Sequence, residues 1–402
     1  MTLPQWTPTP RELADLELEL YGALPGDAPF SVKTSREFAD SVEDAFELID
    51  PEGVPLATVA LGERTPDADG VSLSGTTTPL SPNEFGPFRR YHRAPADVRA
   101  EQPDAFAVPV VAPPTLDDIE AINTHAKESG RTPLLLACTG PGSPQGVSAP
   151  ALVRTVLTAS HDIPGSVVAA AAVAARDDAD ADARFRERVA AAYADDVLPL
   201  RAEGSRSAAI EAIRAHDHPP RPERGLVIFF TGLSGSGKST LARALYDVIV
   251  ERGERTITSL DGDVVRHHLS KGLGFSKEDR ETNIARIGWV AAEIARHHGV
   301  AICSPIAPFD STRQLVRQMV DDAGGGFALI HVATPLEECE RRDRKGLYAK
   351  ARAGVIPEFT GISSPYEEPA DPLVRVDTTG RTIEDALSDV VGALTDAGWL
   401  RQ

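Results

Sequence analysis

Residues 225–250 read GLVIFFTGLSGSGKSTLARALYDVIV, and this stretch decides the fold of the C-terminal half. Its first seven residues form a continuous apolar run, typical of a strand buried on both faces of a parallel sheet. Residues 232–239 follow the pattern G-x-x-x-x-G-K-[ST], and residues 241–252 predict a helix that ends on a glycine. A glycine-rich loop in this context points backbone N–H groups at phosphates, so the sequence predicts a nucleotide site.

The elements beyond this loop continue to alternate between strands and helices. Apolar runs predict strands at 256–260, 300–306 and 327–334, and helical periodicity is found at 279–299 and 311–322. This order indicates an α/β fold with a parallel, doubly wound sheet.

The phosphate-binding loop assigns roles to individual residues. Lys238 is expected to reach the β- and γ-phosphates, and the Ser239 hydroxyl to ligate Mg²⁺, which makes ATP and Mg²⁺ the expected cofactors. The residues expected to contact the nucleotide are Gly232, Ser234, Gly235, Ser236, Gly237, Lys238, Ser239 and Thr240.

Two carboxylates, Asp261 and Asp263, directly follow the strand predicted beside the loop strand. They therefore fall at the carboxyl edge of the sheet, where ligands bind, and could accept a hydroxyl proton or hold the water shell of a metal. The alternative is an Asp-Gly-Asp turn that only caps the next helix.

Three long segments resemble adenylyl-sulfate kinase, the enzyme that phosphorylates adenylyl sulfate at its 3'-hydroxyl. They are SLDGDVVRHHLSKGLGFSKEDRETNIARIG (259–288), VAICSPIAPF (300–309) and RDRKGLYAKARAGVIPEFTGISSPYEEP (342–369). The resemblance covers essentially the whole chain after residue 224. It implies a P-loop kinase whose acceptor is adenylyl sulfate, with Asp263 orienting the acceptor hydroxyl and Asp261 assisting near Mg²⁺.

The resemblance also assigns an acceptor site. Paired hydrogen bonds from guanidinium groups suit a phosphosulfate anhydride, and two aromatic rings are expected to sandwich the acceptor adenine. The alternative for those rings is that each only plugs its loop into the core. The acceptor-binding residues expected on this basis are Arg266, Phe275, Arg280, Asn283, Ile306, Ala307 and Phe359.

Residues 343–369 are rich in glycine and basic residues and have little apolar periodicity, which is typical of a mobile lid. Lys350 matches the lid lysine of the family and is expected to place positive charge on the transferring phosphoryl group. A solvated surface lysine is the alternative.

Two positions depart from the family pattern. Ala307 stands where a serine is often found, and Asp310 stands where arginine or alanine is common. An acid facing an anionic acceptor would weaken its binding. Two other functions therefore stay open: a kinase of the same fold acting on a different nucleotide or alcohol, and a non-catalytic nucleotide-sensing module.

The N-terminal half resembles the N-terminal region of ATP sulfurylase in RELADLELELYGAL, EGVPLA and TPLSPNEFGPFRRYHRAPADVRAE. Sulfurylase chemistry needs the elements Gln-x-Arg-Asn-Pro-x-His-x-x-His and Gly-Arg-Asp-His, and the sequence has neither. We expect an α+β, PUA-like domain at 1–117, an inactive sulfurylase-like α/β remnant at 118–202, a linker at 203–224 and the kinase domain at 225–402.

Composition restricts the partners and the compartment. A net charge of −19 argues against a nucleic-acid or anionic-membrane partner. The three cysteines lack zinc spacing. Neither a signal segment nor an 18-residue apolar run is apparent, so a cytoplasmic protein is expected. The related kinases suggest a homodimer.

Overall fold

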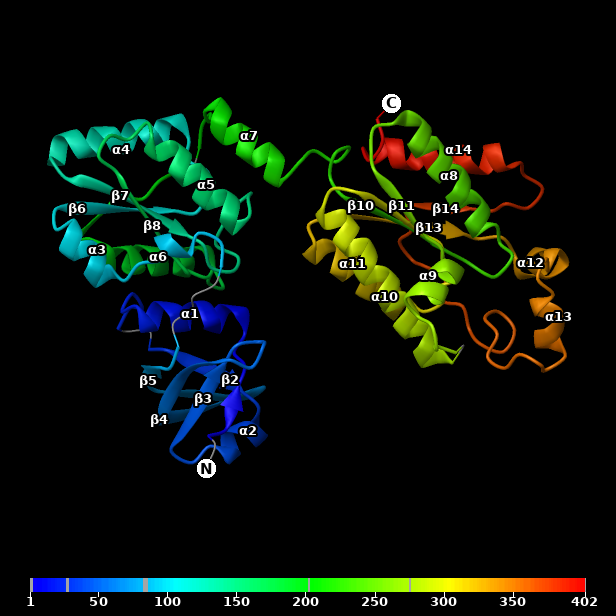
Figure 1. The fold of residues 1–402 in the computed structure, drawn as a ribbon, viewed down its shortest axis with the longest axis horizontal. Coiled ribbons are helices and arrows are strands. Elements are labelled where there is room, and N and C mark those ends of the chain that lie inside the picture. Colours follow the sequence, from blue (N-terminus) through cyan, green and yellow to red (C-terminus); the bar gives the residue numbers. More distant parts are fainter. Residues whose placement is uncertain (1–2, 27–28, 82–85, 202, 275, 402) are drawn as a thin grey trace. The chain divides into compact units, whose positions relative to one another are not determined.

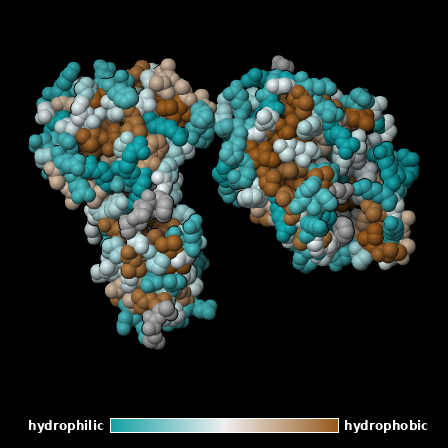
Figure 2. Space-filling view, in the orientation of Figure 1, coloured by the Kyte–Doolittle hydropathy of each residue, from teal (hydrophilic) through white to brown (hydrophobic). Residues whose placement is uncertain are grey.

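A computed structural model describes residues 3–26, 29–81, 86–201, 203–274 and 276–401. The chain divides into two compact units, Met1–His218 and Pro219–Gln402 (Figure 1). Each unit carries hydrophilic residues over much of the visible face, with smaller apolar patches between them (Figure 2). Within the described ranges, no helix is long and apolar enough to cross a membrane.

The C-terminal unit is built on a five-stranded sheet in the order β11-β12-β10-β13-β14. All neighbouring strands are parallel, which confirms the predicted doubly wound sheet. The strands are β10 (Leu226–Thr231), β11 (Ile257–Leu260), β12 (Val300–Cys303), β13 (Gly326–Val332) and β14 (Val374–Val376).

Helices cover both faces of this sheet (Figure 1). The cores place α8 (Lys238–Arg252) and α14 (Ile383–Asp396) on one face, and α10 (Lys277–Arg296) and α11 (Asp310–Asp322) on the other. Three short helices lie near the carboxyl ends of the strands: α9 (Gly262–His268), α12 (Leu336–Arg342) and α13 (Leu347–Arg352).

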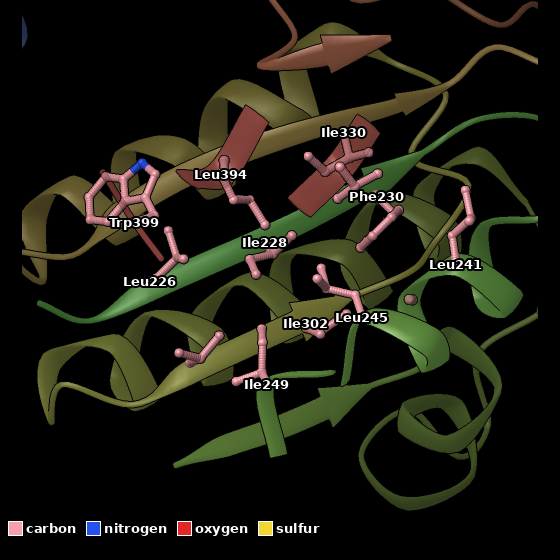
Figure 3. Close-up of a cluster of buried hydrophobic side chains, with 14 of the residues drawn as sticks. Leu226, Ile228, Phe230, Leu241, Leu245, Ile249, Ile302, Ile330, Leu394 and Trp399 are labelled. Carbon is pink, nitrogen blue, oxygen red and sulfur yellow. The ribbon is translucent and has the colours of Figure 1, made fainter. Parts of the chain in front are cut away.

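Strand β10 runs through the middle of the sheet and is buried on both sides. Leu226, Ile228 and Phe230 pack against the α8 and α14 side, as Figure 3 shows. Val227 and Phe229 pack against the α10 and α11 side. Because the side chains on both faces meet a core, the strand is apolar from Leu226 to Phe230 instead of alternating between apolar and polar residues.

The N-terminal unit contains two sheets. The first has the order β1-β3-β4-β5-β2; only the β1 and β3 pair is parallel among its described pairings. Its elements are β1 (Gln5–Trp6), α1 (Pro10–Leu20), β2 (Ser31–Thr34), α2 (Arg36–Ser41), β3 (Ala45–Ile49), β4 (Pro55–Asp67) and β5 (Gly70–Pro79). Helix α1 connects the two sheets, because Leu16 packs in the core of the first and Leu18 in the core of the second.

The second sheet has four parallel strands in the order β8-β7-β6-β9. Its strands are β6 (Ala105–Val110), β7 (Thr132–Cys138), β8 (Val167–Ala171) and β9 (Asp196–Val197). The helices around it are η1 (Arg89–Tyr91), α3 (Pro95–Glu101), α4 (Leu116–Ser129), α5 (Ala149–Ser160), α6 (Ala179–Tyr193) and α7 (Ala208–Asp217).

Two expected segment boundaries in this unit were misplaced. The boundary between residues 117 and 118 cuts the second sheet, since β6 precedes it and pairs in register with β7. The expected linker 203–224 also contains α7, which packs on α5 through the fully buried Ile210 and accepts hydrogen bonds from Ser148 on Asp217. The reason is the same in both places: a short apolar element gains its stability from a distant partner that local pattern does not reveal.

Candidate functional site

A cavity of about 930 Å³ lies in the C-terminal unit at the carboxyl ends of β10, β11 and β12. This is the edge at which parallel sheets bind ligands. Thirteen predicted site residues line it: Ser234, Gly235, Gly237, Lys238, Ser239, Thr240, Asp261, Arg266, Arg280, Asn283, Ile306, Ala307 and Phe359. The structure thus brings the nucleotide set and most of the acceptor set to one space.

The phosphate-binding loop has a backbone that needs glycine. Gly232 has φ +149°, and a Cβ added there would lie 2.4 Å from the carbonyl oxygen of Val332. Gly237 has φ +103° and stands directly before α8. The Thr334 and Thr378 hydroxyls each donate to the carbonyl oxygen of Ser236 at 2.9 Å, which fixes the loop at this residue.

Lys238 is buried within this loop, with 6% of its surface exposed. Its Nζ donates to the carbonyl oxygen of Leu233 at 2.7 Å. Burial lowers the pKa of Lys238 to about 8, and the nearby Asp261 carboxylate acts in the opposite direction. A desolvated ammonium next to its own loop carbonyls is well placed to bind a phosphate oxygen.

Ser239 and Asp261, the residues predicted to hold Mg²⁺, both line the cavity with side-chain oxygen atoms that could bind a cation. Asp261 also accepts a hydrogen bond from Ser304 Oγ at 3.2 Å, which orients the carboxylate. Mg²⁺ is usually held by one or two protein oxygens together with substrate phosphates and water, and this pair fits that pattern. In the part of the chain that the structure describes, no group of three or more His, Cys, Asp or Glu side chains could hold a metal ion by itself.

The part of the cavity that was predicted to bind the acceptor contains buried polar atoms without a hydrogen-bond partner among the described residues. Asn283 is 5% exposed, and its Oδ1 has no hydrogen-bond partner among the described residues. Arg280 donates from Nη1 to Thr360 Oγ1 at 3.0 Å, whereas its buried Nε has no partner in the same part of the chain. Such orphaned groups are costly without a ligand, so they indicate a site for one.

Five predicted residues are placed differently or lie outside what can be described. Lys350 is exposed and is not among the residues that line the cavity. Gly232 and Ser236 belong to the loop but are buried and do not line the cavity. Asp263 lies in α9, but its side chain is outside the described part of the structure, as is the whole of Phe275.

Other lid cations line the cavity where Lys350 was expected. Arg344 and Lys345, in the turn between α12 and α13, belong to its lining. Lys345 is close enough to Lys238 to lower its pKa further.

The departures at Ala307 and Asp310 have a structural explanation. Ala307 lines the cavity with φ +44°, a left-handed conformation, and its carbonyl accepts from the fully buried Arg313 at 2.8 Å. The other nitrogen of that guanidinium, Nη2, donates to Asp310 at 3.1 Å and to the carbonyl of Glu367 at 2.9 Å. Asp310 is therefore engaged with Arg313 and does not line the cavity, so the expected repulsion of an anionic acceptor is not supported.

Sequence reasoning missed several lining residues, notably Tyr348, Thr378 and Arg342. Arg342 donates to both the hydroxyl and the carbonyl of Thr378, at 2.8 and 3.0 Å. Thr378 lies just after β14, and a position after a strand end is the signal that could have identified it. The signal could not be used because β14 has only three residues and was not predicted.

The parallel sheet of the N-terminal unit has a corresponding edge, at the carboxyl ends of β7 and β8. Arg176 follows β8 and donates from both terminal nitrogens to Asp15, at 2.6 and 2.8 Å. Its guanidinium also lies 3.5 Å from the centre of the Phe185 ring. Gly140 follows β7, and a Cβ there would lie 2.3 Å from the backbone of Val173. At these positions the edge is occupied by paired charge and tightly packed backbone.

Comparison with known proteins gives the following similarities. Residues 224–377 match the family model described as adenylylsulphate kinase. The hexameric APS kinase from Thiobacillus denitrificans has a TM-score of 0.80 at 26% identity, covering 99% of this chain and 94% of that one. The APS kinase of Mycobacterium tuberculosis, solved with AMPPNP and APS, is 44% identical over 43% of this chain and 99% of that chain, with a TM-score of 0.41.

Among curated proteins, the sulfate adenylyltransferase of Neosartorya fischeri is 47% identical over 181 residues. These residues are 45% of this chain and 32% of that protein. The chain therefore spans about a third of the length of this relative.

Proposed function

We propose, on the premise that the C-terminal unit belongs to the adenylylsulphate kinase family, that this chain transfers the γ-phosphoryl group of MgATP to the 3'-hydroxyl of adenylyl sulfate. The products are ADP and 3'-phosphoadenylyl sulfate. The neighbour that covers 99% of this chain is named an APS kinase, which supports the same acceptor.

One observation carries the proposal: the phosphate-binding loop and the unpaired acceptor-side atoms face the same cavity. Lys238 and Ser239 line one part of it, and Arg280 and Asn283 line another. A kinase needs both substrates in one water-poor space, because the acceptor hydroxyl must attack in line with the leaving ADP. A nucleotide-sensing module would not require the second set of orphaned groups.

The residues divide the work as follows. Lys238 neutralises charge on the β- and γ-phosphates. Ser239 and Asp261 would hold Mg²⁺, which would offset further phosphate charge. Asp263 remains the proposed partner of the acceptor hydroxyl. Arg280 and Asn283 bind the acceptor, with Phe359 against its adenine. In our proposal, Lys345 instead of Lys350 places positive charge on the transferring phosphoryl group, because Lys345 is the one of the two that lines the cavity.

The test measures ADP release from the full chain with MgATP, with and without adenylyl sulfate. We expect release to depend on the acceptor, and we expect a product that carries the new phosphate on the 3'-oxygen. Asn283→Ala is expected to raise the KM for adenylyl sulfate by about tenfold, because a buried hydrogen bond to the ligand is worth about 1–1.5 kcal/mol. ADP release that is unchanged by saturating adenylyl sulfate would favour another acceptor.

For the N-terminal unit, we propose a sulfurylase-like fold without sulfurylase activity. The pairing of Arg176 with Asp15 and the missing histidine elements support this, because a triphosphate needs uncommitted donors at the sheet edge. Incubation of the full chain with sulfate, MgATP and pyrophosphatase should give no adenylyl sulfate. Its formation would refute the proposal.

The assembly and the compartment also remain proposals. We expect a cytoplasmic protein, and the sequence predicts a homodimer. The APS kinase from Thiobacillus denitrificans, which is similar over 99% of this chain, is described as hexameric. Light scattering during size-exclusion chromatography would separate these two assemblies.

A further inference from the structure

Tyr348 connects the two halves of the cavity. It lies on α13 in the expected lid, lines the cavity and is 1% exposed. Its hydroxyl donates to the carbonyl oxygen of Ser234, inside the phosphate-binding loop, at 2.8 Å. One lid side chain thus contacts the loop that is expected to hold ATP.

The ring of the same tyrosine contacts the acceptor side. The centres of the Tyr348 and Phe359 rings lie 5.0 Å apart, with the planes at 77°. An edge-to-face pair of this kind adds to ordinary burial and fixes the orientation of both rings. Since Phe359 is expected to face the acceptor adenine, Tyr348 supports the acceptor wall from behind.

The backbone around Tyr348 is held in place as well. Asp343 accepts hydrogen bonds from the backbone N–H groups of Tyr348 and Ala349, at 3.1 and 3.0 Å. These bonds satisfy donors in the first turn of α13 and fix the start of the helix against the turn before it. The side chain is therefore anchored at its backbone, its ring and its hydroxyl.

We infer that Tyr348 is a positioning residue that sets the distance between the phosphate-binding loop and the acceptor wall. Its contacts with the two walls are chemically separate: the hydroxyl donates to the loop, and the ring packs against Phe359. The inference rests on the proposed kinase function, because only a transfer between two bound substrates requires a fixed spacing between these walls.

The two contacts can be removed one at a time. Tyr348→Phe keeps the ring and removes the hydroxyl, and with it the hydrogen bonds to the Ser234 carbonyl and to the Cys339 thiol. Tyr348→Leu removes both the hydrogen bonds and the ring pair with Phe359. The chain offers a matched control in Tyr193→Phe, because Tyr193 is also 1% exposed and its hydroxyl donates to a single backbone carbonyl, that of Arg93, at 2.9 Å, in the N-terminal unit.

The experiment measures KM for both substrates in the full chain, together with ADP affinity by calorimetry. Tyr348→Phe should raise the KM for ATP and the Kd for ADP by about 3–10-fold, the effect of one lost hydrogen bond, and leave the KM for adenylyl sulfate within about twofold. Tyr348→Leu should raise the KM for adenylyl sulfate as well, by about 3–10-fold. Tyr193→Phe should change none of the three constants.

The contrary result is equally specific. If Tyr348→Phe binds ADP like the wild type, or if both Tyr348 variants change only the melting temperature, as Tyr193→Phe is expected to do, Tyr348 is merely a core residue. ADP affinity is measured without the acceptor, so the test of the contact between Tyr348 and the loop remains valid even if adenylyl sulfate is not a substrate. Failure of the kinase proposal would instead appear as wild-type protein that does not turn over adenylyl sulfate.

Discussion

Replacement of Lys238 by methionine should abolish turnover and at the same time stabilise the C-terminal unit in the absence of nucleotide. The side chain is buried and charged, and its pKa is lowered from 10.5 to about 8 mainly by that burial. At about 1.36 kcal/mol for each pKa unit, keeping the charge inside the loop costs roughly 3 kcal/mol. Methionine has a similar length and no charge, so it avoids this cost.

The gain is reduced by one lost contact. Without the ammonium group, the carbonyl of Leu233 loses the donor that lies 2.7 Å away, at a cost of about 1–2 kcal/mol. The net expectation is a stabilisation of about 1–2 kcal/mol at pH 7, or about 3–6 °C in the melting temperature of a unit of this size. Turnover should fall by about 100-fold or more, since the transferring phosphates lose their main protein cation.

The assay is scanning calorimetry of the full chain, in which the transition that ADP shifts identifies the C-terminal unit. Lys127→Met, an exposed lysine on α4, is the control and should move neither transition by more than about 0.5 kcal/mol. The melting temperature of the Lys238→Met transition should be higher without ADP and nearly independent of ADP. The wild-type transition should be lower and strongly ADP-dependent.

The dependence on pH provides the decisive check. Between pH 8 and pH 10.5 the folded state has released the Lys238 proton while the unfolded state still holds it, so wild-type stability contains a contribution that rises with pH. Lys238→Met lacks this contribution, and its advantage should shrink across that window. A variant that is less stable than wild type at pH 7, or an advantage that grows from pH 8 to pH 10, would refute the reasoning.

Three further outcomes are expected. Arg280→Lys should raise the KM for adenylyl sulfate by about 10–100-fold and leave the KM for ATP within about twofold, because an ammonium group cannot reproduce the guanidinium contacts. Both constants are measured by ADP release, and equal changes in the two would contradict this expectation. Gly232→Ala should abolish ADP binding in calorimetry, since its Cβ would lie 2.4 Å from the carbonyl of Val332, whereas Gly253→Ala, at a position with no atom within 4 Å of the added Cβ, should bind ADP normally. Burial lowers the pKa of His331 to about 4. As the pH falls from about 6.5 to 4, the unfolded state therefore binds a proton that the folded state does not, and the free energy of unfolding should decrease. His331→Gln should flatten this part of the plot of stability against pH, and an unchanged slope would argue against a buried neutral imidazole.

The C-terminal fold could be predicted from sequence because its signals are local. The strand 226–231 is apolar from Leu226 to Phe230 and buried throughout, and glycines of the loop adopt positive φ angles that other residues rarely adopt. The alternating elements then determine the sheet. Strand β14 and helix α14 were missed: the strand has only three residues, and its pairing with β13 is a tertiary contact.

Site residues could be predicted where a motif or a strand end fixes their position. They could not be predicted where the path of the chain in three dimensions decides which side chain lines the cavity. Lys238, Ser239 and Asp261 were found because a phosphate loop and a strand end fix their positions. In the lid, Lys345 and Lys350 are five residues apart and equally basic, and only the turn into α13 decides that the first lines the cavity. For Asp310, the i,i+3 spacing from Arg313 was a usable signal for their ion pair, but the burial of Arg313 against Ala307 and Glu367 is a tertiary feature that the sequence does not show.

The two parallel sheets of this chain differ at their carboxyl edges. Whether such an edge can bind a ligand or is filled by packed side chains depends on whether its polar atoms already have partners within the fold. In the N-terminal unit, Arg176 is held by Asp15 and rests on Phe185, so its charge is neutralised within the fold. In the C-terminal unit, Lys238 donates its hydrogen bond to the neutral carbonyl of Leu233, and Asn283 Oδ1 has no hydrogen-bond partner among the described residues. A fold that leaves buried polar atoms unsatisfied gives up stability, and ligand binding can restore it. On this argument, Asp15→Ala would release the Arg176 charge without creating a site, because the backbone packing at Gly140 would still exclude a triphosphate; ADP should therefore shift only the C-terminal transition of that variant.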